Sequence, residues 1–176
     1  GGGGGGGGGA LRLVSASDEA TEAVGAALAR HLRLGDVVLL HGDLGAGKTS
    51  LSRGLIRELM GDPLMRVTSP SYLLDNTYDA PGLGGVVHHM DLYRLPVPTD
   101  VSFLGVPGLY ADSLSLIEWP DRLGELHPAE WLDLHLAIAP GGERVLSLTP
   151  RGGRYEGVVR GLEGEAPPEW GAERTR

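Results

Sequence analysis

The single lysine of the chain, Lys48, lies in the segment Gly42-Asp43-Leu44-Gly45-Ala46-Gly47-Lys48-Thr49, and every other basic residue is an arginine. The spacing G-x-x-x-x-G-K-[ST] is typical of a phosphate-binding loop. Its glycines let backbone N–H groups turn towards a phosphate, the lysine reaches the β- and γ-phosphates, and the threonine hydroxyl ligates Mg²⁺. The segment therefore predicts a nucleoside triphosphate site with Mg²⁺, formed by Asp43, Leu44, Gly45, Ala46, Gly47, Lys48, Thr49 and Ser50.

The flanking sequence decides whether this match is accidental, because glycine supplies 30 of the 176 residues. Before the loop, residues 37–41 are an apolar run typical of a short buried strand. After it, Leu51, Leu55, Ile56 and Leu59 recur at helical spacing, and Gly61 is placed to end that helix. A strand, a glycine-rich turn and a helix are the context that the motif requires.

Two carboxylates could complete such a site, since each follows an apolar strand segment. Asp91 comes directly after residues 86–90, and Glu118 comes after residues 115–117. Acids at the carboxyl edge of a parallel sheet can hold Mg²⁺ or position the attacking water, although they also serve as ordinary strand caps. We predict that Lys48, Asp91 and Glu118 are catalytic and that Thr49 and Glu118 lie on the metal side. Which of Asp91 and Glu118 activates water stays open.

Other residues narrow the chemistry further. His88 and His89 are neighbours in a strand and face opposite ways, so they do not form a two-histidine metal site. We predict that both are structural histidines with satisfied hydrogen bonds. Guanine recognition of the GTPase type needs an Asn-Lys dipeptide, but the only asparagine is Asn76, far from Lys48. ATP is therefore the expected nucleotide.

The elements that must position these residues alternate between helix and strand. Helices are predicted over residues 18–34, with Ser17 as the N-cap, after the loop, and over 155–162. Strands are predicted over residues 37–41, 72–78, 86–90, 115–117, 132–138 and 145–148, the last two as an antiparallel pair at the sheet edge. The fold class is α/β, P-loop NTPase-like, with a mostly parallel central sheet flanked by helices and an antiparallel C-terminal edge.

Length and composition predict one domain over residues 11–162, preceded by a disordered Gly tract over 1–10 and followed by a disordered acidic tail over 163–176. The net charge of −8 gives no reason to expect autonomous nucleic-acid binding. Cysteine is absent, which excludes disulfides and thiolate metal sites but leaves the redox compartment open. No apolar run is long enough to cross a membrane, and we expect a cytoplasmic protein. A plastid or mitochondrial location is the alternative if a transit peptide has been trimmed.

Once these segments are aligned, the chain resembles the TsaE (YjeE) family. The similarity is carried by residues 35–49, by Thr68-Ser69-Pro70-Ser71-Tyr72, by His89-Met90-Asp91-Leu92-Tyr93-Arg94-Leu95 and by Leu116-Ile117-Glu118-Trp119-Pro120. It extends from about Ser15 to about Leu148. The phosphate loop is generic, whereas the D-L-Y-R-L and I-E-W-P segments are specific. Ser71-Tyr72 replaces the usual Thr-Phe, and Pro96 and Pro98 interrupt a region that is usually more helical.

The resemblance implies an ATPase component of the machinery that installs threonylcarbamoyladenosine on tRNA. It implies that Lys48 and Thr49 bind ATP-Mg²⁺, that Glu118 is a metal-side carboxylate and that Asp91 is needed for catalysis. Residues 68–72 would form a switch-like loop, and Trp119 would lie near the nucleotide. The expected partners are TsaD and TsaB type proteins, which the ATPase resets between rounds.

Two other functions fit the same loop. The first is a small-molecule kinase, although residues 96–107 show no arginine-rich lid. The second is a nucleotide-gated binding module with negligible turnover, in which Asp91 and Glu118 are structural caps. ATP hydrolysis that depends on an added acceptor would favour the kinase, and tight ATP binding without hydrolysis would favour the module.

Overall fold

The computed structural model of the chain describes residues 8–96 and 100–176. Within these residues, eight strands form one sheet in the order β3-β4-β5-β2-β6-β7-β1-β8. The four central strands, β4, β5, β2 and β6, are parallel, and the strands on either side pair antiparallel. The strands are β1 (Leu11–Ser15), β2 (Val37–His41), β3 (Asp75–Ala80), β4 (Gly85–Asp91), β5 (Ser113–Glu118), β6 (Trp131–Ile138), β7 (Arg144–Arg151) and β8 (Glu173–Arg174).

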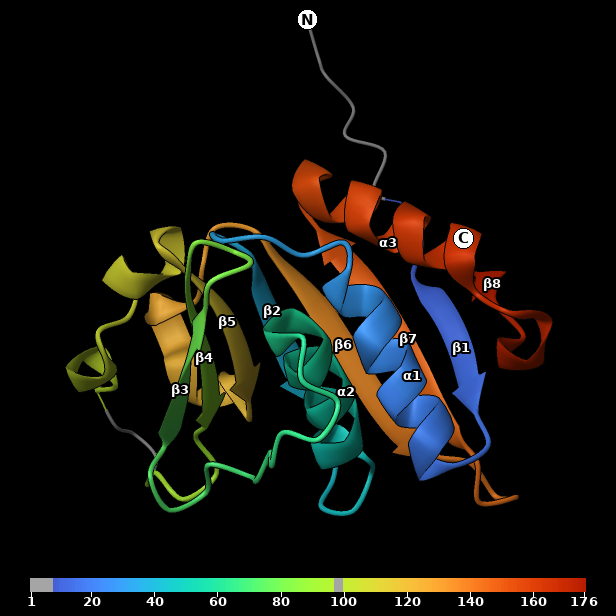
Figure 1. Cartoon of the computed structure of the whole chain (residues 1–176), viewed down its shortest axis with the longest axis horizontal. Helices are drawn as coiled ribbons and strands as arrows, with labels where there is room; N and C mark the ends of the chain where they lie inside the picture. Colours follow the sequence, from blue (N-terminus) through green and yellow to red (C-terminus); the bar gives the residue numbers. More distant parts are fainter. Residues whose placement is uncertain (1–7, 97–99) are drawn as a thin grey trace, which may run out of the picture.

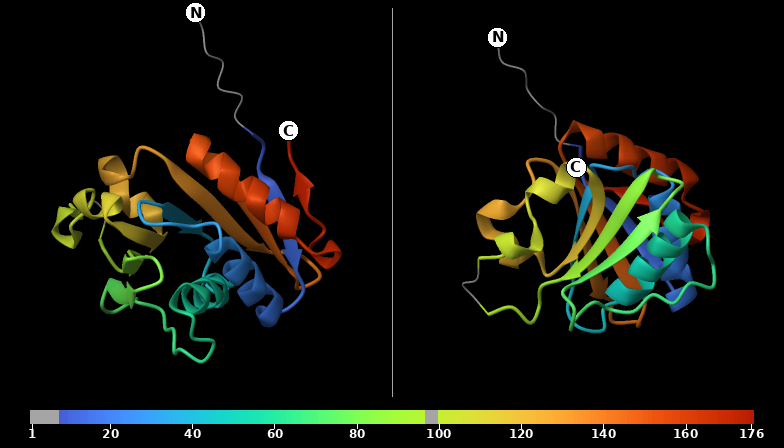
Figure 2. Two further views of the ribbon diagram at one scale, coloured as in Figure 1. Left: turned by 45° about the horizontal axis from the view of Figure 1, so that its top comes forward. Right: turned by 60° about the vertical axis from the view of Figure 1, so that its left-hand side comes forward.

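Three α-helices cover one face of the sheet (Figure 1): α1 (Asp18–Ala29), α2 (Lys48–Met60) and α3 (Gly153–Glu165). The opposite face of β2, β4 and β5 is covered by the 3₁₀ segments η1 (Ser102–Leu104), η2 (Gly108–Ala111) and η3 (Pro120–Leu126) (Figure 2). The larger core lies under the α-helices and the smaller one under the 3₁₀ segments. No helix in the described ranges is long and apolar enough to span a membrane.

The α/β class with a parallel centre and an antiparallel C-terminal edge is confirmed. Ser17 caps α1 as predicted, accepting a hydrogen bond from Ala20 N at 3.1 Å, but α1 ends at Ala29 rather than near residue 34. Similarly, β3 begins at Asp75 instead of residue 72. The β6–β7 pair is antiparallel, but the unpredicted β1 and β8 lie beyond it, so β7 is not at the edge.

The prediction of a disordered tail over residues 163–176 is wrong. Helix α3 continues to Glu165, η4 (Pro168–Trp170) follows, and β8 pairs with Leu11 and Arg12 of β1. Trp170 gives this polar segment a large apolar side chain to bury. It is only 7% exposed and joins the larger core. The folded unit therefore extends past residue 162. Most of the predicted Gly tract, residues 1–7, lies outside the described residues.

Helices α1 and α2 cross at two glycines. A Cβ atom added at Gly54 would lie 1.9 Å from the backbone oxygen of Glu22, and one added at Gly25 would lie 2.2 Å from that of Leu51. These distances place backbone against backbone, closer than any side chain would allow. Because α2 begins at Lys48, this crossing fixes the start of α2 against α1.

We expect Gly54→Ala to destabilise the fold by about 1–3 kcal/mol, because the new methyl group must push the two backbones apart. Gly157→Ala in α3 is the matched control, since no atom lies within 4 Å of the added Cβ there. That control should stabilise the helix by about 0.5–1 kcal/mol. Urea unfolding of both variants measures the difference. Equal stability of Gly54→Ala and wild type would contradict the close crossing.

Candidate functional site

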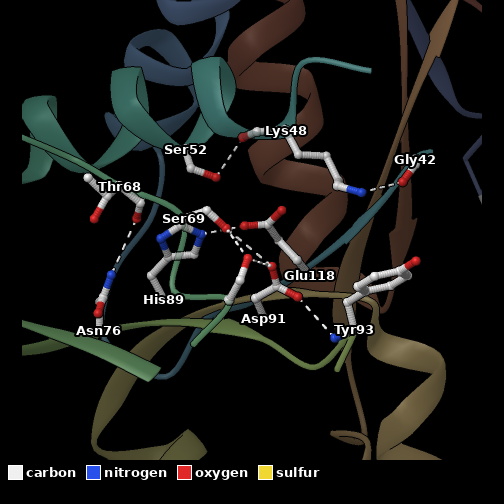
Figure 3. A network of polar contacts seen from close by, with 11 residues as sticks. Gly42, Lys48, Ser52, Thr68, Ser69, Asn76, His89, Asp91, Tyr93 and Glu118 are labelled. Atoms are coloured by element: carbon white, nitrogen blue, oxygen red, sulfur yellow. Dashed lines mark hydrogen bonds and ion pairs between the residues drawn. The ribbon is translucent and has the colours of Figure 1, made fainter. Parts of the chain in front are cut away.

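The glycine-rich loop joins β2 to α2 and depends on glycine at two positions. Gly45 (φ 81°) and Gly47 (φ 108°) have left-handed backbone conformations, which residues other than glycine rarely adopt. The loop closes on itself through a hydrogen bond from Ala46 N to Asp43 O at 3.1 Å. Helix α2 then begins at Lys48, whose Nζ donates to Gly42 O (Figure 3). The lysine is thereby held inside the curve of its own loop.

A cleft of about 340 Å³ opens beside this loop. Its walls come from the loop, the first turns of α1 and α2, the segment before β3, and the ends of β4, β5 and β7. The lining residues are Asp18, Leu44, Gly45, Gly47, Lys48, Thr49, Ser50, Ser69, Ser71, Asp91, Tyr93, Glu118, Trp119 and Arg144.

Asp91 and Glu118 meet because β4 and β5 are parallel and place these two residues in register. Both are buried, at 4% and 3% exposed. Asp91 Oδ2 accepts hydrogen bonds from the hydroxyls of Ser69 (3.2 Å) and Ser71 (3.1 Å), and its Oδ1 accepts one from Tyr93 N at 3.0 Å. Asp91 therefore ties residues 69–71 to the end of β4.

Glu118 has a buried histidine as its partner. His89 Nε2 donates to Glu118 Oε2 at 2.7 Å, and the imidazole is fully enclosed. The other ring nitrogen, Nδ1, is buried without a hydrogen-bond partner. The prediction of fully satisfied strand histidines is therefore wrong for His89, whereas His88 Nδ1 pairs with Asp75 Oδ2 at 2.8 Å.

Lys48 is a desolvated cation facing these acids. It is 7% exposed, and burial lowers the pKa of its ammonium, while the charges of Glu118, Asp91 and Asp43 oppose that shift. The ammonium lies 4.2 Å from the centre of the Trp119 ring. Trp119 turns sharply after β5, with a left-handed backbone (φ 56°), and its ring packs against Tyr93 at 4.7 Å. With Asp18 and Arg144, which also line it, the cleft thus combines two cations, three carboxylates and an aromatic wall.

The structure brings most of the predicted site residues to this one cleft, but two lie elsewhere. Ala46 is buried behind the loop, and the exposed Asp43 lines a separate hollow with His41 and Trp119. Sequence reasoning missed Asp18 and Arg144. Arg144 Nη2 donates to Gly45 O at 3.3 Å, and no local signal marks it, because it reaches the loop from 99 positions away.

A family model described as "Threonylcarbamoyl adenosine biosynthesis protein TsaE" matches residues 15–145. The chain belongs to the TsaE family. The match includes every residue that lines the cleft, from Asp18 to Arg144. The part of the chain that matches the TsaE family therefore contains the whole lining of the cleft.

Similar proteins agree with this assignment. The tRNA threonylcarbamoyladenosine biosynthesis protein TsaE of Rickettsia bellii is 33% identical over 133 residues, covering 76% of this chain and 90% of the relative. The protein of the same name from Bacillus subtilis is 32% identical over 149 residues, covering 83% and 89%. The crystal structure of B. subtilis YdiB superposes with a TM-score of 0.73 at 27% identity, covering 90% of this chain and 97% of that one. The P-loop-like fold of the TsaE family is thus shared along nearly the whole chain.

Proposed function

We propose that this chain is a Mg²⁺-dependent ATPase that supports threonylcarbamoyladenosine formation at adenosine 37 of tRNA by binding and resetting a TsaD–TsaB complex. The observation that carries the proposal is the convergence of Lys48, Asp91 and Glu118 on the cleft beside the glycine-rich loop. A buried cation facing two buried carboxylates suits a site where phosphate and metal charges must balance. We place the protein in the cytoplasm.

The residues of the cleft fit a nucleotide and Mg²⁺. No atom lies within 4 Å of a Cβ added at Gly45, so the loop leaves open space where a phosphate would approach its N–H groups. Thr49 presents a hydroxyl and Glu118 a carboxylate, the oxygen ligands that Mg²⁺ prefers. When bound, Mg²⁺ would neutralise phosphate charge as the bond to the γ-phosphate breaks.

In the proposed hydrolysis, each of the protein's own site residues has a separate role. Lys48 stabilises the charge on the β- and γ-phosphates, and the Trp119 ring closes one side of the cleft. His89 orients Glu118 on the metal side through the 2.7 Å hydrogen bond. Asp91 remains to position the attacking water or accept its proton. Because Ser69 and Ser71 bond to the same Asp91 oxygen, residues 68–72 would respond to occupation of the site.

The test is Mg²⁺-dependent ATP hydrolysis by the purified chain, alone and with a TsaD–TsaB pair. Stimulation by the pair that is lost in Lys48→Ala and Glu118→Gln supports the proposal. Turnover that ignores the pair but depends on an added phosphate acceptor would indicate a kinase instead. Tight ATP binding with no hydrolysis, even with the pair present, would indicate a nucleotide-gated module.

His89→Ala is expected to raise the Mg²⁺ concentration needed for half-maximal hydrolysis by about 10–100-fold, because Glu118 loses the group that orients it. His89→Gln keeps a side-chain donor and should recover part of that loss. His88→Ala is the matched control, since its partner Asp75 lies outside the cleft. A Mg²⁺ titration of each variant measures the shift. Reduced activity with an unchanged Mg²⁺ dependence would mean that His89 only supports the fold.

A further inference from the structure

Three metal-ligating side chains gather on the sheet face opposite the α-helices. His41 ends β2, and Asp133 and His135 lie two residues apart on β6. The parallel register pairs His41 with His135, so their side chains project from the same face. The intervening Leu40 and Leu134 point into the larger core under the α-helices. The three residues are thus brought together by two central strands and take no part in the cleft.

The contacts within this cluster bring its donor atoms close together. One ligand atom from each residue lies within 4.8 Å of the other two. His41 Nε2 and Asp133 Oδ1 are 2.8 Å apart, and the two imidazole rings are parallel, with centres 4.1 Å apart. Among the described residues, this is the one group of three histidine, cysteine or acidic side chains that meets so closely.

The surroundings also suit a bound ion. Asp133 is 8% exposed, and its second oxygen accepts a hydrogen bond from Arg151 Nε at 3.1 Å, which orients the carboxylate. His135 is exposed, so its ring can turn towards an ion without disturbing the core. Two imidazole nitrogens and one carboxylate oxygen favour Zn²⁺, Co²⁺ or Ni²⁺ over Mg²⁺, which prefers oxygen ligands.

We propose that His41, Asp133 and His135 form a second site, separate from the nucleotide cleft, that binds one divalent transition-metal ion of the zinc type. Solvent would supply the remaining coordination position on the exposed side of His135. The ion would then be bound by His41, which directly precedes Gly42, the first residue of the glycine-rich loop. This site does not depend on ATP hydrolysis, so it can be tested whether or not the proposed ATPase activity is found.

The test is calorimetric titration of Zn²⁺ into untagged protein, with Mg²⁺ in excess to occupy magnesium sites. Co²⁺ absorption spectra report the ligand geometry independently. Wild type should bind one ion, and His135→Ala and Asp133→Asn should weaken the affinity at least about 10-fold. The matched control is His88→Asn, because the His88–Asp75 pair has the same 2.8 Å contact but belongs to no such group of three within residues 8–96 and 100–176. It should bind Zn²⁺ like wild type.

Folding does not obscure the result, because His135 is an exposed side chain and His135→Ala should keep the wild-type circular dichroism spectrum. Absence of Zn²⁺ binding by wild type would overturn the proposal. So would equal affinity in wild type and His135→Ala, since the ion would then be held elsewhere. A Co²⁺ spectrum lost in His135→Ala and retained in His88→Asn would support it.

Discussion

Lys48→Ala should lower ATP hydrolysis by about 100- to 1000-fold, the effect of removing one charge stabiliser from a preorganised site. The ammonium is buried, held by Gly42 O and faced by both carboxylates. Arg144, the other cation that lines the cleft, is bonded to Gly45 O at 3.3 Å. Lys48→Arg should also lose most of the activity, because a planar guanidinium does not fit the space of a compact ammonium. Steady-state hydrolysis with saturating Mg²⁺ measures both losses.

The fold should tolerate Lys48→Ala. Burial of the ammonium carries a desolvation cost, and Ala is a good helix former at the first position of α2. The melting temperature should therefore not fall. Arg53→Ala is the control on the same helix, because Arg53 bonds to Glu22 at 3.0 Å and lies outside the cleft. Hydrolysis that persists in Lys48→Ala, or that falls equally in Arg53→Ala, would remove Lys48 from the proposed mechanism.

Trp170→Ala should destabilise the protein by about 3–5 kcal/mol, the usual cost of deleting a large buried aromatic side chain. Trp170 ends η4, is 7% exposed and belongs to the larger core. Its loss would also loosen the pairing of β8 with β1. The free energy of unfolding from a urea titration measures the effect.

The neighbouring Glu169 provides the control, because it is exposed and lies on the same short turn. Glu169→Ala should change stability by less than about 0.5 kcal/mol. If Trp170→Ala unfolds at the same urea concentration as this control, residues 166–176 contribute nothing to the core. A fall in stability without a change in ATP hydrolysis would show that this segment supports the sheet and not the cleft.

Patterns within short stretches of sequence made one half of the candidate site predictable. The spacing of the loop, the apolar run before it and the helical spacing after it are all read within about 25 consecutive residues. Asp91 and Glu118 were predictable because parallel strands end at one edge, and the structure pairs them in register. Each of these predictions depended on a pattern contained in a single segment.

What could not be predicted depends on contacts between distant segments. His89 meets Glu118 across 29 positions, and Arg144 reaches Gly45 across 99. Strand β1 alternates weakly, and its pairing with β7 follows only once the sheet order is known. The prediction of a disordered tail is wrong because composition averages over fourteen residues and gives little weight to the one tryptophan that packs into the core. The cluster of His41, Asp133 and His135 likewise follows from the register of two strands.

The crossing of α1 and α2 at Gly25 and Gly54 has a consequence for motion. Because the two backbones are in close contact at both glycines, we expect α1 and α2 to move as one body, so that the loop does not shift by sliding α2 along α1. We expect the displacement caused by nucleotide to be taken up by residues 68–74, which Ser69 and Ser71 attach to Asp91 and which end at Leu74 with φ 65°. Amide hydrogen exchange with and without ATP would then change in this segment and stay constant along the helix pair. The close helix crossing at the two glycines would thus keep α1 and α2 fixed while residues 68–74 change conformation.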